Sequence, residues 1–215
     1  MSWVRWTYVS QEAGQELVIP DGCRDVLFEM RPGAAPAVVA PTLDAAPRLS
    51  RTTAGPICTG FRLPPGVVPP SAALAEAASP AACAQVLADA VAAQSEAAGI
   101  AAALAAPGGS VSSAAAEAGV SPRTLQRRLK AQGGPPPDFW RLLGRARRAA
   151  RLLSAGWALA DSAMEAGYSD QAHMTRAFRR WFGAPPAALC ADPALLANVT
   201  QPGLGNWTGE QISTR

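Results

Sequence analysis

Residues 167–186, with the sequence GYSDQAHMTRAFRRWFGAPP, contain the only histidine of the chain, three arginines and several large apolar residues. A histidine that acts as a general base needs a hydroxyl, thiol or carboxylate partner within hydrogen-bonding distance. No such residue stands at useful spacing on the helix expected to contain His173, so we do not expect catalysis here. We favour a helix face that meets an acidic partner, and an idle surface position is the alternative.

The four cysteines, at positions 23, 58, 83 and 190, are scattered and form no C-x-x-C pair. Metal ligation needs clustered ligands at short spacing, so we expect no metal site and no zinc-dependent alkyl transfer. We expect reduced thiols in a cytoplasmic protein. Cys23 lies in the turn PDGC between Asp21 and Asp25, whose negative charges raise the pKa of a thiol, and a buried structural thiol is the expectation. A ligand-lining role for this turn stays open.

Charge is distributed unevenly along the 215-residue chain. The first 105 residues have 6 basic and 9 acidic side chains, whereas residues 106–215 have 13 basic and 7 acidic side chains. This asymmetry predicts that a polyanion binds one half only. The sequence shows neither a signal-peptide pattern nor an apolar run of about 18 residues, so we expect a cytoplasmic protein without a membrane partner.

Changes in composition divide the chain into four parts. Residues 1–70 contain short runs such as ELVIP, DVLFEM and CTGFRLPPG, separated by turns with proline and glycine such as PDGC, and these runs predict a small β-rich sensor or regulatory domain. Residues 71–106 are alanine-rich and predict a connector of two short helices, one of them with Ser79 as N-cap. Residues 107–191 are helical throughout and form the predicted DNA-binding domain. Residues 192–215 lack periodicity, and we expect a poorly ordered tail.

The helical part contains an internal repeat, SSAAAEAGVSPRTLQRRLKAQGG and ADSAMEAGYSDQAHMTRAFRRWFG. Each copy predicts a short helix with a small residue four places before a glycine, then a polar cap and a basic helix. Gly119 and Gly167 allow the positive φ of a tight turn. Ser121 and Asp170 are the expected N-caps, and the second turn is one residue longer than the first.

The basic helices of the two copies align with an offset of 49 residues. Leu125 and Leu129 match Met174 and Phe178, and the spacing of four predicts that all of them face the core. Basic and amide side chains then lie on the outer face, where Arg can contact guanine, Gln can contact adenine, and Arg or Lys can contact phosphate. The predicted DNA-contacting residues are Arg123, Gln126, Arg127, Lys130, Ala172, His173, Thr175, Arg176, Arg179 and Arg180.

Between the copies, residues 135–156 predict one long linker helix that begins after a run of prolines. Such a helix would hold two recognition helices at a fixed separation, so that they could enter successive major grooves about 34 Å apart. Arg141, Arg145 and Arg148 share the polar side of this helix. Either phosphate contact or a structural role fits them.

Three pieces, GVSPRTLQRRLK, RARRAARLL and AMEAGYSDQAHMTRAFRRWFGAPPAAL, resemble the DNA-binding domain of AraC/XylS-type transcriptional regulators. The resemblance covers residues 111–190 and is most specific in the last piece. Leu129 and Met174 occupy core positions where this family often has Phe, a change that should cost little. The residues that the resemblance implies to face bases are Arg123, Gln126, Arg127, Ala172, His173 and Arg176. Because Ala172 cannot make a polar contact, the second helix should contact fewer bases or only a thymine methyl group.

Two further motifs, VIPDGCRDVLF and GFRLPPGVV, resemble the small β-rich regulatory domain that precedes this module in a subset of such regulators. The segment is short compared with a cupin-like sensor barrel, which argues against a deep ligand pocket. The expected fold class is α+β. A small β-rich N-terminal domain is followed by an all-α double helix-turn-helix domain with a long linker helix.

The predicted function is sequence-specific DNA binding in transcriptional regulation, with no enzymatic activity and no cofactor. Double-stranded DNA is the predicted partner, and a small-molecule effector, a second copy of the chain and RNA polymerase are further hypotheses. The alternative is an architectural or protein-interaction module with weak sequence preference. A strong preference for one DNA sequence would separate the two.

Overall fold

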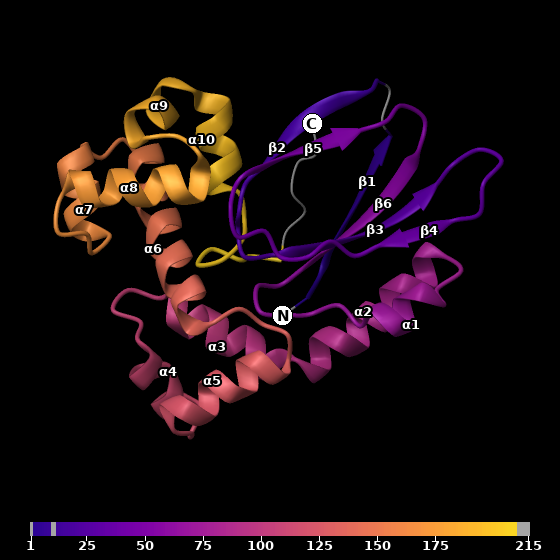
Figure 1. Cartoon of the computed structure of the whole chain (residues 1–215), viewed down its shortest axis with the longest axis horizontal. Coiled ribbons are helices and arrows are strands. Elements are labelled where there is room, and N and C mark those ends of the chain that lie inside the picture. Colours follow the sequence, from indigo (N-terminus) through magenta and orange to yellow (C-terminus); the bar gives the residue numbers. More distant parts are fainter. Residues whose placement is uncertain (1, 10–11, 210–215) are drawn as a thin grey trace.

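In the computed structural model, which describes residues 2–9 and 12–209, a β-rich part lies beside a helical part (Figure 1). The predicted α+β fold class is confirmed. The strands are β1 (Val4–Val9), β2 (Gly14–Val18), β3 (Arg24–Met30), β4 (Ala37–Val39), β5 (Arg48–Thr52) and β6 (Ile57–Leu63). The helices are α1 (Ser71–Ala75), α2 (Pro80–Ala93), α3 (Ser95–Ala105), α4 (Val111–Glu117), α5 (Pro122–Ala131), α6 (Pro137–Ser154), α7 (Leu159–Glu165), α8 (Gln171–Phe182), α9 (Pro186–Ala191) and α10 (Pro193–Thr200).

The strands form two antiparallel sheets, one in the order β1–β6–β3–β4 and the other a β2–β5 pair. Side chains alternate between the faces of the larger sheet. On one face Val26, Phe28 and Phe61 pack against Leu74 of α1 and Leu87 of α2, and this cluster is the core of the β-rich part. The opposite face lines a cleft whose other walls are β2, β5 and α10.

This cleft has a volume of about 1190 Å³ and is open to solvent. Ligand pockets commonly measure about 300–1,000 Å³, so the β-rich part has room for a small molecule. Because the cleft is open to solvent, it is compatible with the expectation that this short segment encloses no deep ligand pocket. Two separate sheets leave a gap between them, and the C-terminal helix α10 supplies the remaining wall.

The alanine-rich connector forms α1, α2 and α3 where two helices are predicted. Ser79 caps α2 as predicted, and its hydroxyl accepts a hydrogen bond from Ala82 N at 3.2 Å. At the end of α2 the Gln94 side chain bonds both the N–H and the carbonyl of Val68, at 2.9 and 2.8 Å. Gln94 lies at the boundary between the two cores. Helix α2, before it, packs on the sheet, whereas most buried residues of α3, after it, pack within the helical part.

The helical core holds both repeats around α6. It contains Trp140 and Leu143 of α6, Leu104 of α3 and the buried residues of both basic helices. Helix α6 runs uninterrupted over 18 residues, and the predicted single linker helix is confirmed. The two repeats therefore share one rigid support.

Helix α6 crosses α3 at short range because glycine occupies the crossing point. A β-carbon at Gly144 would lie 2.6 Å from the Ala105 β-carbon and 2.8 Å from its α-carbon. We expect Gly144→Ala to lower the free energy of unfolding by about 1–3 kcal/mol, the usual cost of overpacking, although alanine has the better helix propensity. Urea unfolding of the purified chain measures this change.

Gly99→Ala in α3 is the matched control, because no described atom lies within 4 Å of a β-carbon built there. This variant should gain about 0.5–1 kcal/mol from the intrinsic preference of alanine for helix. Equal stability of the two variants would contradict a close crossing of α3 and α6.

Residues 192–209 are folded, which corrects the prediction of a poorly ordered tail over residues 192–215. Asp192 caps α10, and its Oδ1 accepts from Ala194 N and Leu195 N, both at 3.0 Å. Val199 and Leu204 are fully buried in the helical core. The sequence of these residues has no periodic apolar pattern, because α10 is short and because the residues after it are held by hydrogen bonds to their main-chain carbonyls. Residues 210–215 of the predicted tail lie outside the described residues.

Cys23, Cys58 and Cys83 are buried, Cys190 is exposed, and all four are free thiols. Burial is the main cause that raises the pKa of the Cys23 thiol, and the charge of Asp25 adds to it. Cys23 is thus a buried thiol of the predicted kind. Over residues 2–9 and 12–209 there is no cluster of three or more potential metal ligands, and no helix is long and apolar enough to span a membrane.

Candidate DNA-binding surface

The two helix-turn-helix units have equivalent turns. Gly119 after α4 has a φ of 65°, and Gly167 after α7 has a φ of 86°. The next residues, Val120 and Tyr168, each donate a main-chain hydrogen bond of 2.9 Å to the carbonyl five residues earlier. This bond closes a helix end around a left-handed glycine, and its presence in both units gives the sequence repeat a structural counterpart.

The predicted N-caps begin both basic helices. Ser121 Oγ accepts from Thr124 N at 3.2 Å at the start of α5. Asp170 Oδ1 accepts from His173 N at 2.6 Å at the start of α8. The His173 N–H bond stabilises the ionised carboxylate and is the main cause that lowers the pKa of Asp170. One recognition helix therefore has a neutral cap and the other a charged cap.

We expect the cap of α8 to lose its effect in acid. A carboxylate whose pKa is lowered on folding stabilises the fold above its ordinary pKa of 3.8, and this contribution disappears as the pH falls through the lowered value. The free energy of unfolding should therefore fall more steeply from about pH 5 to about pH 2 in the wild type than in Asp170→Ser, which keeps a neutral cap. Identical slopes for the two proteins would contradict this assignment.

The inner faces of the basic helices are buried as predicted. Leu125 and Leu129 of α5 are 0% and 2% exposed, and Met174 and Phe178 of α8 are both 0% exposed. All of them belong to the core around α6. Because this face is fixed, the remaining face of each helix must point outward.

The outer face of α5 is free for an external partner. Its predicted contact residues are all exposed, and none of them takes part in an ion pair within the described residues; they are Arg123, Gln126, Arg127 and Lys130. Arg128, the other arginine of α5, instead pairs with Glu96 of α3. Arg128 therefore makes a contact within the protein, whereas Arg123 and Arg127 are available to an external ligand.

The outer face of α8 is basic but more mixed. Ala172, Arg176, Arg179 and Arg180 are exposed. Thr175 is half-buried, and its hydroxyl donates to Gln171 O at 2.8 Å, which leaves only its oxygen lone pairs for another donor. The Arg180 guanidinium lies over the Trp181 ring, 4.9 Å from the centroid, so it is partly held at the end of the helix.

His173 is half-buried and has partners in the preceding turn. Its ring packs edge-on against Tyr168 at 5.1 Å, and Nδ1 lies 3.2 Å from Ser169 Oγ. The sequence argument considered only the helix itself and therefore missed Ser169. The Ser169 hydroxyl donates to Asp170 Oδ2 at 3.2 Å, so the carboxylate caps the helix and does not orient the imidazole. These contacts position Nε2 of His173 as the ring nitrogen left for an outside partner.

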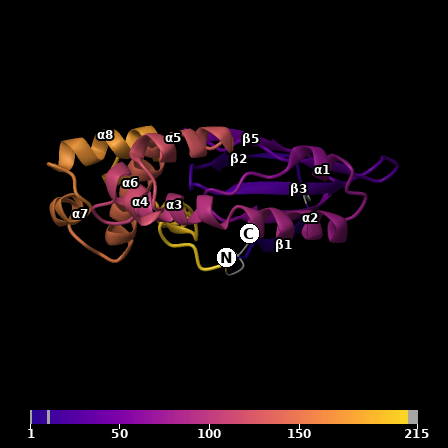
Figure 2. The same cartoon turned by 90° about the horizontal axis from the view of Figure 1, so that it is seen from below.

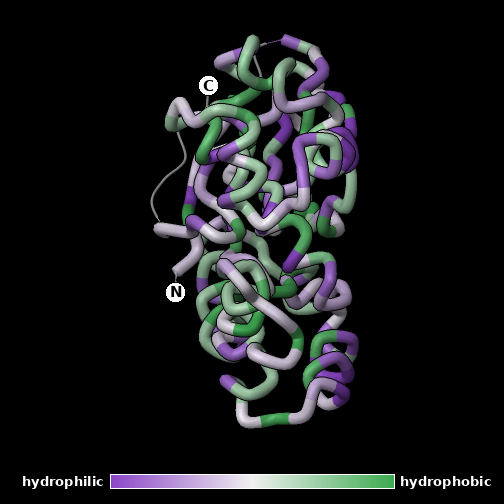
Figure 3. The backbone as a smooth tube through the Cα atoms, turned by 90° about the vertical axis from the view of Figure 1, so that its left-hand side faces the viewer, coloured by the Kyte–Doolittle hydropathy of each residue, from purple (hydrophilic) through white to green (hydrophobic). Residues whose placement is uncertain are grey.

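Both recognition helices face the same side of the molecule. Figure 2 shows α5 and α8 along one edge of the body, and Figure 1 shows α6 between them. In Figure 3 hydrophilic segments gather along the edge where these helices lie. Two basic helices on one side of a rigid support can meet one extended polyanion together.

The linker arginines have partners within the protein. Arg145 donates to Gly167 O at 3.2 Å, and its guanidinium lies 4.5 Å from the centroid of the Tyr168 ring. Arg148 donates to Ala105 O at 2.9 Å, and Arg141 pairs with Asp138 at 3.0 Å. For Arg145 and Arg148 these contacts favour the structural role, because they tie the second turn and α3 to α6, whereas the Arg141 pair lies within α6 and leaves both alternatives open.

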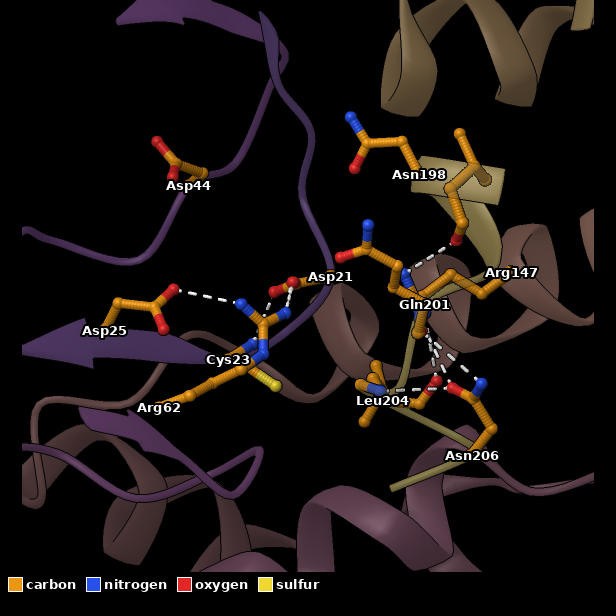
Figure 4. Close-up of polar contacts among 12 residues, drawn as sticks. Asp21, Cys23, Asp25, Asp44, Arg62, Arg147, Asn198, Gln201, Leu204 and Asn206 are labelled. Carbon is orange, nitrogen blue, oxygen red and sulfur yellow. Dashed lines mark hydrogen bonds and ion pairs between the residues drawn. The ribbon is translucent and has the colours of Figure 1, made fainter. Parts of the chain in front are cut away.

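Arg147 of α6 is a buried structural residue that the sequence argument did not identify. It is 1% exposed, and burial lowers its pKa to about 10. Its guanidinium donates to Val199 O at 2.9 Å, Leu204 O at 3.1 Å, Asn206 Oδ1 at 3.2 Å and Gln201 O (Figure 4). None of the ion pairs among the described residues includes it. Arg147 stands four residues after Leu143, on the apolar side of the helix, and this spacing is the sequence feature that could have predicted its burial.

Comparisons with known proteins match the helical part. A family model described as a helix-turn-helix domain matches residues 114–191, and a model described as a bacterial regulatory protein of the Fis family matches residues 92–131. The HTH-type transcriptional regulator VirS of Mycobacterium tuberculosis, in strains CDC 1551 / Oshkosh and H37Rv, is 43% identical over 67 residues. That match covers 31% of this chain and 20% of the VirS sequences. No solved structure shows a significant match.

Proposed function

We propose that this chain, which contains an AraC/XylS-type helix-turn-helix domain at residues 114–191, is a transcriptional regulator that binds specific DNA sequences through two recognition helices. The resemblance noted in the sequence motifs is confirmed by the family match and by the similarity to VirS. One observation carries the finer proposal: two equivalent turns present two exposed basic helix faces on one side of a shared linker helix.

The side chains suit a division between base and phosphate contact. Gln126, Arg127 and Arg176 are exposed on the outer faces, and their amide and guanidinium groups are the types that bond adenine and guanine in the major groove. Lys130 and Arg179, in the last turns of their helices, suit phosphate contact, which contributes affinity that depends on salt. The remaining predicted contact residues, Arg123, Ala172, His173, Thr175 and Arg180, complete the surface.

Selection of random duplexes by the purified full chain tests this function. We expect enrichment of one motif with two half-elements about ten base pairs apart, since the two helices would occupy successive major grooves. A salt titration on the selected duplex should give a steep slope, about 0.9 for each phosphate contacted. Binding without an enriched motif would instead support an architectural module. Effector control, self-association and contact with RNA polymerase stay hypotheses.

A further inference from the structure

The imidazole of His173 is held in one orientation at the start of the second recognition helix. His173 is the third residue of α8 and is half-buried. Its ring packs edge-on against Tyr168, which is 3% exposed, with the ring centroids 5.1 Å apart. Tyr168 is held in turn by the guanidinium of Arg145, which lies 4.5 Å from the centroid of the phenol ring. Packing that extends from α6 through Tyr168 therefore decides which edge of the imidazole points outward.

The hydroxyl of Ser169 decides which ring nitrogen of His173 carries the proton. Ser169 Oγ lies 3.2 Å from Asp170 Oδ2 and 3.2 Å from His173 Nδ1. A hydroxyl has one proton to donate, and a hydrogen bond to an ionised carboxylate is about twice as strong as one to a neutral acceptor. The Asp170 carboxylate is ionised at neutral pH, since the bond from His173 N–H lowers its pKa. The hydroxyl proton therefore goes to Asp170, and Ser169 Oγ accepts a hydrogen bond from Nδ1–H.

Nε2 of His173 is consequently an acceptor that an outside partner can reach. In a neutral imidazole one nitrogen carries the proton, and the bond that it makes fixes the other nitrogen as an acceptor. Over residues 2–9 and 12–209, Nε2 has no hydrogen-bond partner and is not among the buried polar atoms that lack one, so it is accessible. The arginines of the same helix face can only donate hydrogen bonds. His173 thus adds an acceptor to a face made mostly of donors.

A single acceptor in the major groove distinguishes two classes of base. The amino groups of cytosine N4 and adenine N6 are donors, whereas guanine O6 and N7 and thymine O4 are acceptors. Phosphate oxygens are also acceptors, so a neutral Nε2 cannot bond the DNA backbone. Base contacts come mainly from the N-terminal residues of a recognition helix, where His173 lies. The chemistry of Nε2 therefore favours a base with an amino group.

We propose that His173 is a specificity-determining residue that accepts a hydrogen bond from the amino group of cytosine or adenine, and that Ser169 is the positioning residue that sets its tautomer. The base contact rests on the proposed function, whereas the tautomer can be tested on the protein alone. Thr124 stands at the equivalent position of the first unit, 49 residues earlier, so this contact belongs to the second unit only.

NMR on the full chain without DNA tests the tautomer. His173 is the only histidine, so a chain purified without a histidine tag gives one set of ring signals. Long-range nitrogen–proton correlations distinguish a proton on Nδ1 from a proton on Nε2. At about pH 8.5, where histidine side chains are ordinarily neutral, the wild type should have the Nδ1–H form as its main species. Ser169→Ala should lose this predominance, and Ser169→Thr, which keeps a hydroxyl, should retain it. A main species with the proton on Nε2, or an unchanged tautomer in Ser169→Ala, would overturn the proposal.

Competition binding with variants of the selected duplex tests the base contact. The contacted position is the one at which His173→Ala loses the preference of the wild type. There the wild type should bind cytosine or adenine at least about fivefold more tightly than guanine or thymine, the effect of one hydrogen bond. Ser169→Ala should reduce this ratio to below about twofold, because both tautomers become available, whereas Ser169→Thr should keep it.

Four results would overturn the base contact. They are a preference that His173→Ala leaves intact at every position, a preference of the wild type for guanine or thymine at the contacted position, a full preference in Ser169→Ala, and an equal loss of affinity for all four bases in that variant. The last result would show that Ser169 has only a structural role. A failure to find any duplex would overturn the proposed function and the base contact with it, whereas the tautomer measured by NMR would stand.

Discussion

Arg147→Met is expected to lower the free energy of unfolding by about 3–5 kcal/mol, because it leaves several buried carbonyls without donors. The affected acceptors are Val199 O, Gln201 O and Leu204 O. Replacement of a buried ion pair by apolar residues can be neutral when every polar partner is removed together. That compensation is not available here, since main-chain carbonyls cannot be substituted. Because methionine keeps much of the aliphatic volume of arginine, the decrease in the free energy of unfolding measures mainly the lost hydrogen bonds.

Arg141→Met is the matched control, because Arg141 lies on the same helix but is partly exposed and pairs with the exposed Asp138. Arg141→Met should lower the free energy of unfolding by no more than about 1 kcal/mol, the usual contribution of an exposed ion pair. Urea unfolding gives both values, and limited proteolysis should show early cleavage after residue 197 in Arg147→Met alone. If Arg147→Met lowered the free energy of unfolding no more than Arg141→Met does, this would contradict the role of Arg147 as the anchor of residues 199–206.

The helical part was predictable because its signals are local. The Ser121 and Asp170 caps, the turn glycines and the apolar spacing of α5 and α8 each involve residues a few positions apart. The strands of the β-rich part were also indicated locally. Their order β1–β6–β3–β4 was not, because the pairings of β6 with β1 and β3 join residues 27 to 58 positions apart and have no periodic signature.

The contacts that the sequence did not reveal are long-range contacts of charged or main-chain groups. Arg147 is one of five arginines in the linker helix, and its burial depends on carbonyls that come more than 50 residues later. The cleft likewise depends on α10, which closes a wall that the first 70 residues do not supply. The outer faces of α5 and α8 were predicted more easily, because burial of the inner faces decides which residues remain outside.

On the selected duplex, Arg127→Ala and Arg176→Ala should each weaken binding about 5- to 150-fold, or about 1–3 kcal/mol, and relax the preference at one half-element only. Arg127 lies on α5 and Arg176 on α8, and neither takes part in an ion pair among the described residues. The losses in the double variant should therefore add to within about 0.5 kcal/mol. Competition binding against duplexes altered in one half-element measures both effects.

Arg128→Ala separates base contact from a general loss of positive charge. It removes the same charge from the same helix as Arg127→Ala, but its side chain pairs with Glu96 and so points toward α3. It should leave the sequence preference intact and reduce affinity only slightly through long-range electrostatics. If Arg127→Ala and Arg128→Ala behaved alike, charge alone would account for binding, and α5 would not distinguish bases. If only the α8 variant changed the preference, the first unit would serve to position the second, and the equivalence of the two turns would not extend to their contacts with DNA.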